Sequence, residues 1–387
     1  MQIVEYDFIK KRKIMQLFDK ATFCFQNQLP FVLYAKPNEE ILHGVFQNDD
    51  TLYVFENQSG FVFASFYNET HDKKDFFSDK IKKWVPDNQN LNTFSEETNV
   101  IFPLSDSEIF TEEINFEIEN NLVQIENNSD EVSRISFENL VKNGVSEIEN
   151  GTFEKVVLSR KIEVSQSVDF IKSYQNLLKK YPTAFRYLWF HPKVGMWMGA
   201  TPEQLAKIKN STFETVALAG TQVFSETVFW QEKEMVEQQL VTDYIKSRTE
   251  NLVESLQISE VYTQKAGNLV HLKSDISGEL KQNVSELDIV NALHPTSAVC
   301  GMPLERARNF ILEHEMYNRK YYSGFLGEFQ MQEQTNLFVN LRCCEIENNI
   351  TTIYVGCGIT KDSRADKEFI ETENKAKTIL TILVTQK

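Results

Sequence analysis

The feature that most limits the fold of this chain is a succession of short, strand-like runs with few helices between them. The first third contains FVLYAK (31–36), TLYVFE (51–56), GFVFASF (60–66) and NVIFPL (99–104). Later segments with helical periodicity are expected at 137–151, 230–254, 286–293, 303–314 and 365–384. Strands that follow one another without a helix each time favour antiparallel pairing. We therefore predict an α+β fold, and not a doubly wound parallel sheet.

Composition excludes several classes of protein. The chain has 387 residues, of which 41% are apolar, and no run approaches the 18 apolar residues of a transmembrane helix. The N-terminus lacks the apolar core of a secretory signal. Five cysteines without a C-x-x-C pair suggest neither a disulfide framework nor a zinc site, and we expect a cytoplasmic protein. A net charge of −16 argues against nucleic acid as a partner.

The segment EKVVLSRKI (154–162) places a lysine at the start of a buried strand. Val156, Val157 and Leu158 indicate a strand covered on both faces. Alternation puts Lys155 on the same face as Val157 and Ser159. A covered lysine must find a partner, lose its proton or reach water.

Two helical segments carry glutamates on the stripe that we expect to face the core. In 233–246, Glu234 and Glu237 share that stripe with Val241. In the closing helix, Glu368 and Glu371 share a stripe with Lys375, Ile379 and Ile382. A Mg²⁺ ion would offset the cost of burying these carboxylates. Pairing with Lys233, Lys375 or Lys377, or solvation at helix ends, is the alternative.

Other polar residues lie in apolar surroundings. Arg342 falls inside the expected strand LFVNLRCCEI, where it could hold a ligand carboxylate or an internal acid. Gly356 and Gly358 alternate in YVGCGIT, which indicates either close approach of a ligand or tight packing. His294 and Glu203 each follow common structural patterns when taken alone.

In their order along the chain, these segments resemble the chorismate-utilising enzymes, and within them the isochorismate synthases. The blocks are KVVLSR, GATPE, ALAGT, KEMVEQQLV, HPTSAVCGMP, YYSGFLG, LRC, GCGI and EFIETENK. They cover residues 150–380, and the first 130 residues contain no matching motif. We expect one unit over 1–387, with a divergent part at 1–135 and the motifs at 136–387. The resemblance implies two antiparallel sheets packed face to face with helices outside, the fold of anthranilate synthase component I.

The resemblance also implies a reaction and its residues. Lys155 resembles the base that activates water for attack at C2 of chorismate, and Glu203 the acid that protonates the departing C4 hydroxyl. The residues that resemble Mg²⁺ ligands are Glu237, Glu371, Glu234 and Glu368. Those that resemble substrate contacts are Gly220, Thr221, His294, Tyr322, Leu341, Arg342, Gly356 and Lys375. Desolvation would favour the neutral amine that a base requires and the protonated carboxyl that an acid requires.

Sister activities remain as alternatives. Aminodeoxychorismate synthases resemble this chain less, because they have a lysine where it has Ala219. Anthranilate synthases generally lack the lysine that Lys155 provides, and no glutaminase subunit is expected. Salicylate synthases share the lysine, the acid and the metal site, and the pocket residues that would decide are Leu341, Phe325, Leu326 and Val299. A non-catalytic chorismate-binding relative would need neither Lys155 nor Glu203.

One departure concerns the metal site, where Gln238 replaces the histidine that usually follows the first metal-ligand glutamate. The resemblance leaves the choice between menaquinone and siderophore pathways open. We expect a monomer.

Overall fold

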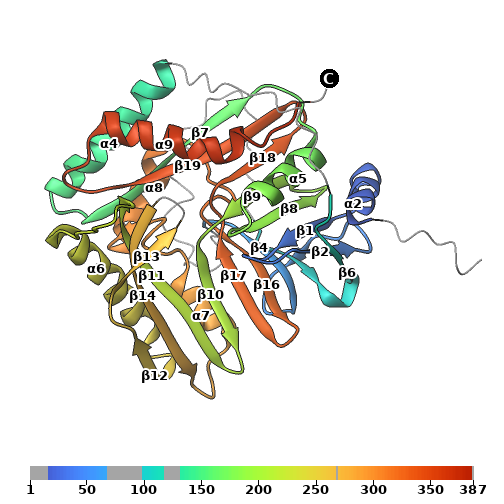
Figure 1. Ribbon diagram of the computed structural model, residues 1–387, viewed down its shortest axis with the longest axis horizontal. Helices are drawn as coiled ribbons and strands as arrows, with labels where there is room; N and C mark the ends of the chain where they lie inside the picture. Colours follow the sequence, from blue (N-terminus) through green and yellow to red (C-terminus); the bar gives the residue numbers. More distant parts are fainter. Residues whose placement is uncertain (1–15, 68–97, 117–130, 267–268, 386–387) are drawn as a thin grey trace, which may run out of the picture.

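Two large antiparallel sheets packed face to face form the framework of the protein (Figure 1). The computed structural model describes residues 16–67, 98–116, 131–266 and 269–385. The first sheet has the spatial order β15 (Gly301–Met302), β7 (Lys155–Val164), β19 (Ile350–Ile359), β18 (Cys343–Glu347), β9 (Gly195–Thr201), β8 (Phe185–His191), β1 (Phe31–Ala35), β2 (Ile41–Gln47) and β6 (Ser107–Glu113). The second has the order β12 (Val253–Ile258), β14 (Leu269–Leu280), β11 (Thr212–Val223), β10 (Gln204–Lys209), β17 (Gln334–Val339), β16 (Phe325–Met331), β4 (Gly60–Ala64), β5 (Val100–Pro103) and β3 (Tyr53–Val54), with β13 (Tyr262–Ala266) beside β14.

Aromatic side chains fill much of the space between the sheets. The ring of Phe63 on β4 stacks on Trp189 of β8, with centroids 4.6 Å apart, and on Tyr321, with centroids 4.4 Å apart. Trp197 of β9 stacks in turn on Tyr354 of β19 at 5.2 Å. Such large rings bury much apolar area per residue, which explains how a chain with 29 phenylalanines uses them.

Helices cover the outer faces of both sheets (Figure 1). Those on the first sheet are α2 (Leu17–Gln26), α4 (Glu131–Glu149), α5 (Phe170–Lys180), α8 (Leu304–His314) and α9 (Ala365–Leu380). Those on the second are α6 (Glu232–Thr249) and α7 (Glu286–Leu293). The prediction of an α+β fold with face-to-face antiparallel sheets and outer helices is therefore confirmed.

The chain crosses from one sheet to the other within a segment that was expected to form a single strand. The expected strand LFVNLRCCEI is divided, because β17 belongs to the second sheet and β18 to the first. Residues 340–342 cross between them, and the pair Pro202–Glu203 makes the opposite crossing from β9 to β10. The Val339 amide donates to the Glu203 carbonyl (2.9 Å) and the Ala200 amide to the Arg342 carbonyl (3.1 Å), so the crossings lie side by side.

The N-terminal part of the chain supplies the last three strands at one end of each sheet, β1, β2 and β6 in the first and β4, β5 and β3 in the second. The four strand-like runs expected there are confirmed as β1, β3, β4 and β5, although β3 is shorter than expected. The sequence analysis missed β2, β6 and α5. Residues 117–130, between β6 and α4, lie outside the described residues.

All five cysteines are buried free thiols. None of the helices in the described part of the chain is long and apolar enough to cross a membrane.

Candidate active site

Lys155 lies at the first position of β7, where the covered part of the strand begins. Val156 and Leu158 are fully buried, as expected, and point to the opposite face from the lysine. The lysine itself keeps 14% of its side chain exposed, and its Nζ lies 3.4 Å from Oε1 of Glu237 on α6. Lys155 therefore reaches both water and a carboxylate partner from the second sheet's outer helix.

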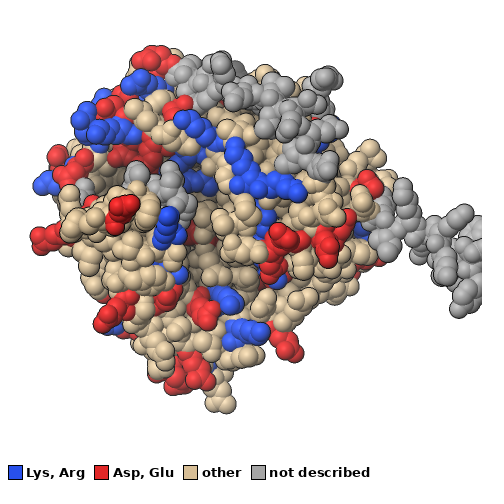
Figure 2. All heavy atoms as spheres, viewed as in Figure 1, with Lys and Arg blue, Asp and Glu red and all other residues tan. Residues whose placement is uncertain are grey.

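A glycine on the neighbouring strand makes room for this lysine. Gly358 of β19 pairs with Val157 in the middle of the sheet, yet it is exposed while Cys357 and Ile359 beside it are buried. A Cβ atom at Gly358 would lie 3.2 Å from Cε of Lys155. The exposure of an interior strand at this point indicates a recess between the sheets, and Figure 2 shows this face of the molecule hollowed near its centre.

Glu203 lies in the crossing from β9 to β10 and is half-buried. Burial raises the pKa of its carboxyl above the ordinary 4.5, while the positive charges of Lys155, Arg342 and Lys375 oppose the rise. That all three cations act on one carboxyl indicates that four predicted site residues, from four separate segments of the chain, lie near one another. A carboxyl in this setting holds its proton to a higher pH than a surface glutamate.

Thr296 was missed by the sequence analysis. Its hydroxyl oxygen is buried without a hydrogen bond of normal geometry to any described residue, and it lies close enough to Glu203 to lower the pKa of that carboxyl. The only sequence signal for it was its position in HPTSAVCGMP, two residues after His294.

Arg342 lies in the crossing from β17 to β18, and not inside a strand as expected. Its backbone has φ +50°, a left-handed conformation that a continuous strand would not allow. Leu341 beside it is partly buried and packs against both the aromatic core between the sheets and the core beneath α6 and α7. The crossing thus turns Arg342 toward Glu203 because the chain must leave one sheet for the other.

Helix α9 brings Lys375 and two glutamates to the site. Lys375 Nζ donates to the Gly356 carbonyl of β19 (2.8 Å) and pairs with Glu371 (2.6 Å). Burial raises the pKa of Glu368, helped by the negative charge of Glu371. The expected inward stripe is wrong, since the buried face consists of Phe369, Thr372, Ala376, Ile379 and Leu380. The glutamates lie at the flank of that face.

In helix α6, too, the glutamates do not lie on the buried face as expected. Its buried side chains include Gln238, Val241 and Ile245, whereas Glu234 and Glu237 are only partly buried. Glu234 Oε2 accepts from the Gln231 amide at the start of the helix (2.9 Å), a capping role typical of a third-position glutamate. Gln238 donates instead to the Ala217 carbonyl of β11 (3.0 Å) and so attaches the helix to its sheet.

Gly220 forms a bulge next to this helix. The register of β11 with β14 shifts between Ala219 and Thr221, and Gly220 has φ +64°. A Cβ atom there would lie 3.2 Å from Cβ of Glu234, so the glycine allows α6 to approach the strand. Thr221 follows the bulge and pairs with His271.

Two of the predicted substrate contacts carry rings, of which Tyr322 is buried and His294 is partly buried. Tyr322 stacks on Tyr354 with centroids 5.6 Å apart, and its hydroxyl would lie 2.8 Å from a Cβ atom at Gly356. His294 Nε2 lies 3.1 Å from the Ser65 carbonyl, and burial lowers the pKa of its imidazole to about 4. The ring is therefore neutral near pH 7 and donates to the backbone, which is a structural role.

The donor chemistry of the site fits a hard divalent cation. Glu237, Glu371, Glu368 and Glu234 offer only oxygen atoms, and ammonium groups at present balance the first two. Among the described residues no three acidic, histidine or cysteine side chains converge as a ready metal site. Mg²⁺ commonly takes one or two carboxylates and completes its shell with substrate and water. One carboxylate from each of α6 and α9 would suffice for that arrangement.

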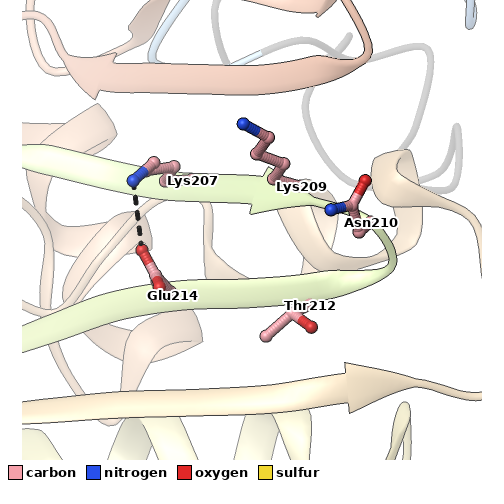
Figure 3. A pocket seen from close by; sticks show the side chains of 5 residues that line it. All are labelled: Lys207, Lys209, Asn210, Thr212 and Glu214. Atoms are coloured by element: carbon pink, nitrogen blue, oxygen red, sulfur yellow. Dashed lines mark ion pairs between the residues drawn. The ribbon is translucent and has the colours of Figure 1, made fainter.

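A surface depression elsewhere does not belong to this site. It lies at the β10–β11 hairpin and is lined by Lys207, Lys209, Asn210, Thr212 and Glu214 (Figure 3). Lys207 pairs with Glu214 across the hairpin at 3.4 Å. Along the strand, Lys209 is roughly 20 Å from Glu203, so this depression has no part in the chemistry above.

Comparison with known proteins agrees with the motif order. A family model described as "Chorismate binding enzyme" matches residues 49–384. Anthranilate synthase component 1 of Thermococcus kodakarensis and isochorismate synthase MenF of Haemophilus influenzae are each 28% identical over 260 residues, which cover 64% of this chain and 60% of each relative. The match thus spans about 60% of the length of these curated relatives.

The fold agrees with that of a solved structure. Menaquinone-specific isochorismate synthase MenF of Escherichia coli superposes with a TM-score of 0.72 at 19% identity, covering 92% of this chain and 89% of MenF. At that identity the likeness establishes the architecture.

Proposed function

The chain belongs to the chorismate binding enzyme family, and from that premise we propose that it is an isochorismate synthase. In this reaction water adds at C2 of chorismate and the C4 hydroxyl leaves. The observation that carries the proposal is the convergence of Lys155 and Glu203, a potential base and a potential acid, beside Arg342 and Lys375.

Glu203 has the properties of a general acid. Its raised pKa keeps the carboxyl protonated to higher pH, and the departing C4 hydroxyl needs that proton to leave as water. Thr296 and the nearby cations moderate the rise, so the carboxyl can still release its proton to the departing oxygen.

Lys155 has the position of a general base. As a neutral amine it would take a proton from the water that attacks C2, which makes the water nucleophilic. Glu237 holds the lysine while the carboxylate is free, because the two lie 3.4 Å apart.

Arg342 and Lys375 offset the charge of the substrate. Chorismate carries two carboxylates, and the whole chain carries −16, so binding requires local positive charge. Arg342 offers a planar fork suited to one carboxylate. Lys375, held on the Gly356 carbonyl, offers a second cation.

Mg²⁺ is part of the proposal. Glu237 and Glu371 would hold the ion, with Glu234 and Glu368 as further ligands or as acceptors for its water. When bound, the ion would neutralise negative charge on the substrate and lower the barrier to departure of the C4 oxygen. The flanking position of these glutamates supports this assignment, since they are partly or fully exposed and not sealed in the core.

The nucleophile separates this proposal from anthranilate synthesis, although anthranilate synthases are equally similar in sequence. Ammonia is nucleophilic without help, whereas water needs a base at the point of attack. Lys155 could act as that base, which favours water over ammonia as the nucleophile. Salicylate formation, in which pyruvate is also eliminated, is the alternative that shares every one of these groups.

The test is to incubate the purified chain with chorismate and Mg²⁺ and to separate the products by chromatography, with pyruvate measured in parallel. Isochorismate without pyruvate supports the proposal. Salicylate with equimolar pyruvate selects the alternative. Anthranilate that forms only when ammonium is added would refute the proposal.

A further inference from the structure

The strand that carries Lys155 has a neighbouring strand on its outer edge for only two residues. β15 pairs with Val156 and Lys155 and then ends. The Val157 amide still reaches the Cys300 carbonyl (2.9 Å), but the edge groups that follow have no neighbouring strand. Buried backbone groups left unpaired would be costly.

A buried ion pair takes the place of the missing strand. Glu315 Oε1 accepts from the Ser159 amide (2.7 Å) and hydroxyl (2.9 Å). Arg319 Nη2 donates to the Val157 carbonyl (2.6 Å). The two side chains also pair with each other, with 1% and 2% of their side-chain surfaces exposed. Carboxylate and guanidinium thus supply one acceptor and one donor to successive edge positions of β7.

The same pair reaches two other segments of the site. Arg319 Nη1 donates to the Val299 carbonyl (2.9 Å), in the segment that follows His294 and Thr296. The Arg319 carbonyl accepts from the Tyr322 amide (2.9 Å). The guanidinium therefore joins the lysine strand to the threonine segment, and its Cζ also lies 5.8 Å from the centre of the Tyr322 ring.

We propose that the buried Glu315–Arg319 pair is a positioning element that fixes Lys155, Thr296 and Tyr322 relative to one another. The inference deepens the proposed function and rests on it. Neither residue touches substrate. Their effect passes through the backbone of β7 and the 294–299 segment. A guanidinium is required because Nε, Nη1 and Nη2 each reach a different partner, whereas the three donors of an ammonium leave from one nitrogen.

The experiment compares Arg319→Lys with a matched control, Arg186→Lys. Arg186 is equally buried and donates to backbone carbonyls, among them those of Ala184 and Leu178. It lies on β8, four strands from β7 and therefore roughly 19 Å away. Both variants lose buried hydrogen bonds, but only the first disturbs the edge of β7.

We expect Arg319→Lys to remain folded and to lose about 10²-fold in kcat, the usual effect of a 1 Å misplacement, with far less change in KM. Amide hydrogen exchange at 157–159 should become faster in this variant. Arg186→Lys should lower thermal stability without either effect. Equal losses of kcat in both variants, or unchanged kcat in Arg319→Lys, would overturn the inference.

Two further measurements keep the result clear. If Arg319→Lys does not fold, the double variant Glu315→Gln/Arg319→Met removes both charges together, which buried pairs often tolerate, and it should show the same loss of kcat. If the wild-type chain turns over no chorismate, the proposed function fails. Exchange at 157–159 then still decides, because rates unchanged by Arg319→Lys would refute the positioning role.

Discussion

Replacement of Gly358 by alanine should disturb the base while leaving the fold intact. The glycine lies on β19 with an ordinary strand conformation, and its new Cβ atom would be 3.2 Å from Cε and 3.8 Å from Nζ of Lys155. The nearest contact is the end of a flexible side chain, so the lysine moves and the backbone does not.

The size of the effect follows from that distance. Carbon atoms pack best at about 3.5–4.0 Å, so Cε of Lys155 must shift by about 0.3–0.8 Å. A shift of 1 Å costs about 10²-fold in rate, which scales to a loss of roughly 4- to 40-fold in kcat. Stability should stay equal or rise by up to about 1 kcal/mol, because alanine restricts the unfolded chain.

Gly144→Ala is a suitable control. Its Cβ atom would also meet a neighbour at 3.2 Å, but that neighbour is Leu158, on the opposite face of β7 from Lys155. We expect wild-type kcat in this variant. The assay is steady-state conversion of chorismate to isochorismate, with thermal melts of all three proteins. Wild-type kcat in Gly358→Ala, or equal losses in both variants, would refute the placement of Lys155 at the reacting centre.

Four other predictions concern the site. Lys155→Ala should abolish turnover but retain the fold and Mg²⁺-dependent chorismate binding, measured by calorimetry; retained turnover would remove Lys155 from the base role. Glu203→Gln should lose turnover. It should also gain stability over the wild type as pH rises from about 4.5 through the raised pKa, because only the folded state keeps the Glu203 proton there; parallel pH–stability curves would contradict this. His294, with a pKa of about 4 against an ordinary 6.5, should cost the wild type up to about 3 kcal/mol of stability as pH falls between those values, and His294→Asn should lose that dependence in denaturant titrations. Chelation should abolish turnover, and Glu371→Gln should raise the Mg²⁺ concentration for half-maximal activity relative to wild type, whereas metal-independent turnover would exclude the ion.

The α+β class was predictable from local pattern, because strands and helices follow the periodicity of neighbouring residues, whereas the face-to-face packing of the sheets was expected from the family resemblance. Residues 156–160 are buried, as the β-branched and apolar residues at 156–158 indicated, and Gly151 follows the end of α4 with φ +76°. The single strand expected at 337–346 was wrong, because local sequence pattern does not show where a chain changes sheets. A change of sheet within a continuous apolar run leaves both halves apolar, so periodicity carries no sign of the break at residues 340–342.

The glutamates of α6 and α9 show a second limit of the sequence. Helical spacing placed them correctly on one side of each helix, but it could not separate the buried face from its flank. Glu371 lies one residue before the buried Thr372, a rotation of about 100°. That difference decides whether a carboxylate is sealed in the core or open to a recess, and only the packing against β19 settles it.

The convergence of the site has a topological cause that no single motif contains. Between the sheets the space is filled with aromatic rings, and outside them with the apolar faces of helices, so a charged side chain has few places to lie. Glu203 and Arg342 occupy the two crossings, where the chain leaves one sheet for the other. Lys155 enters the same region from the end of a strand. The motifs are far apart in sequence because the charged residues that lie between the two sheets come from separate crossings and strand ends.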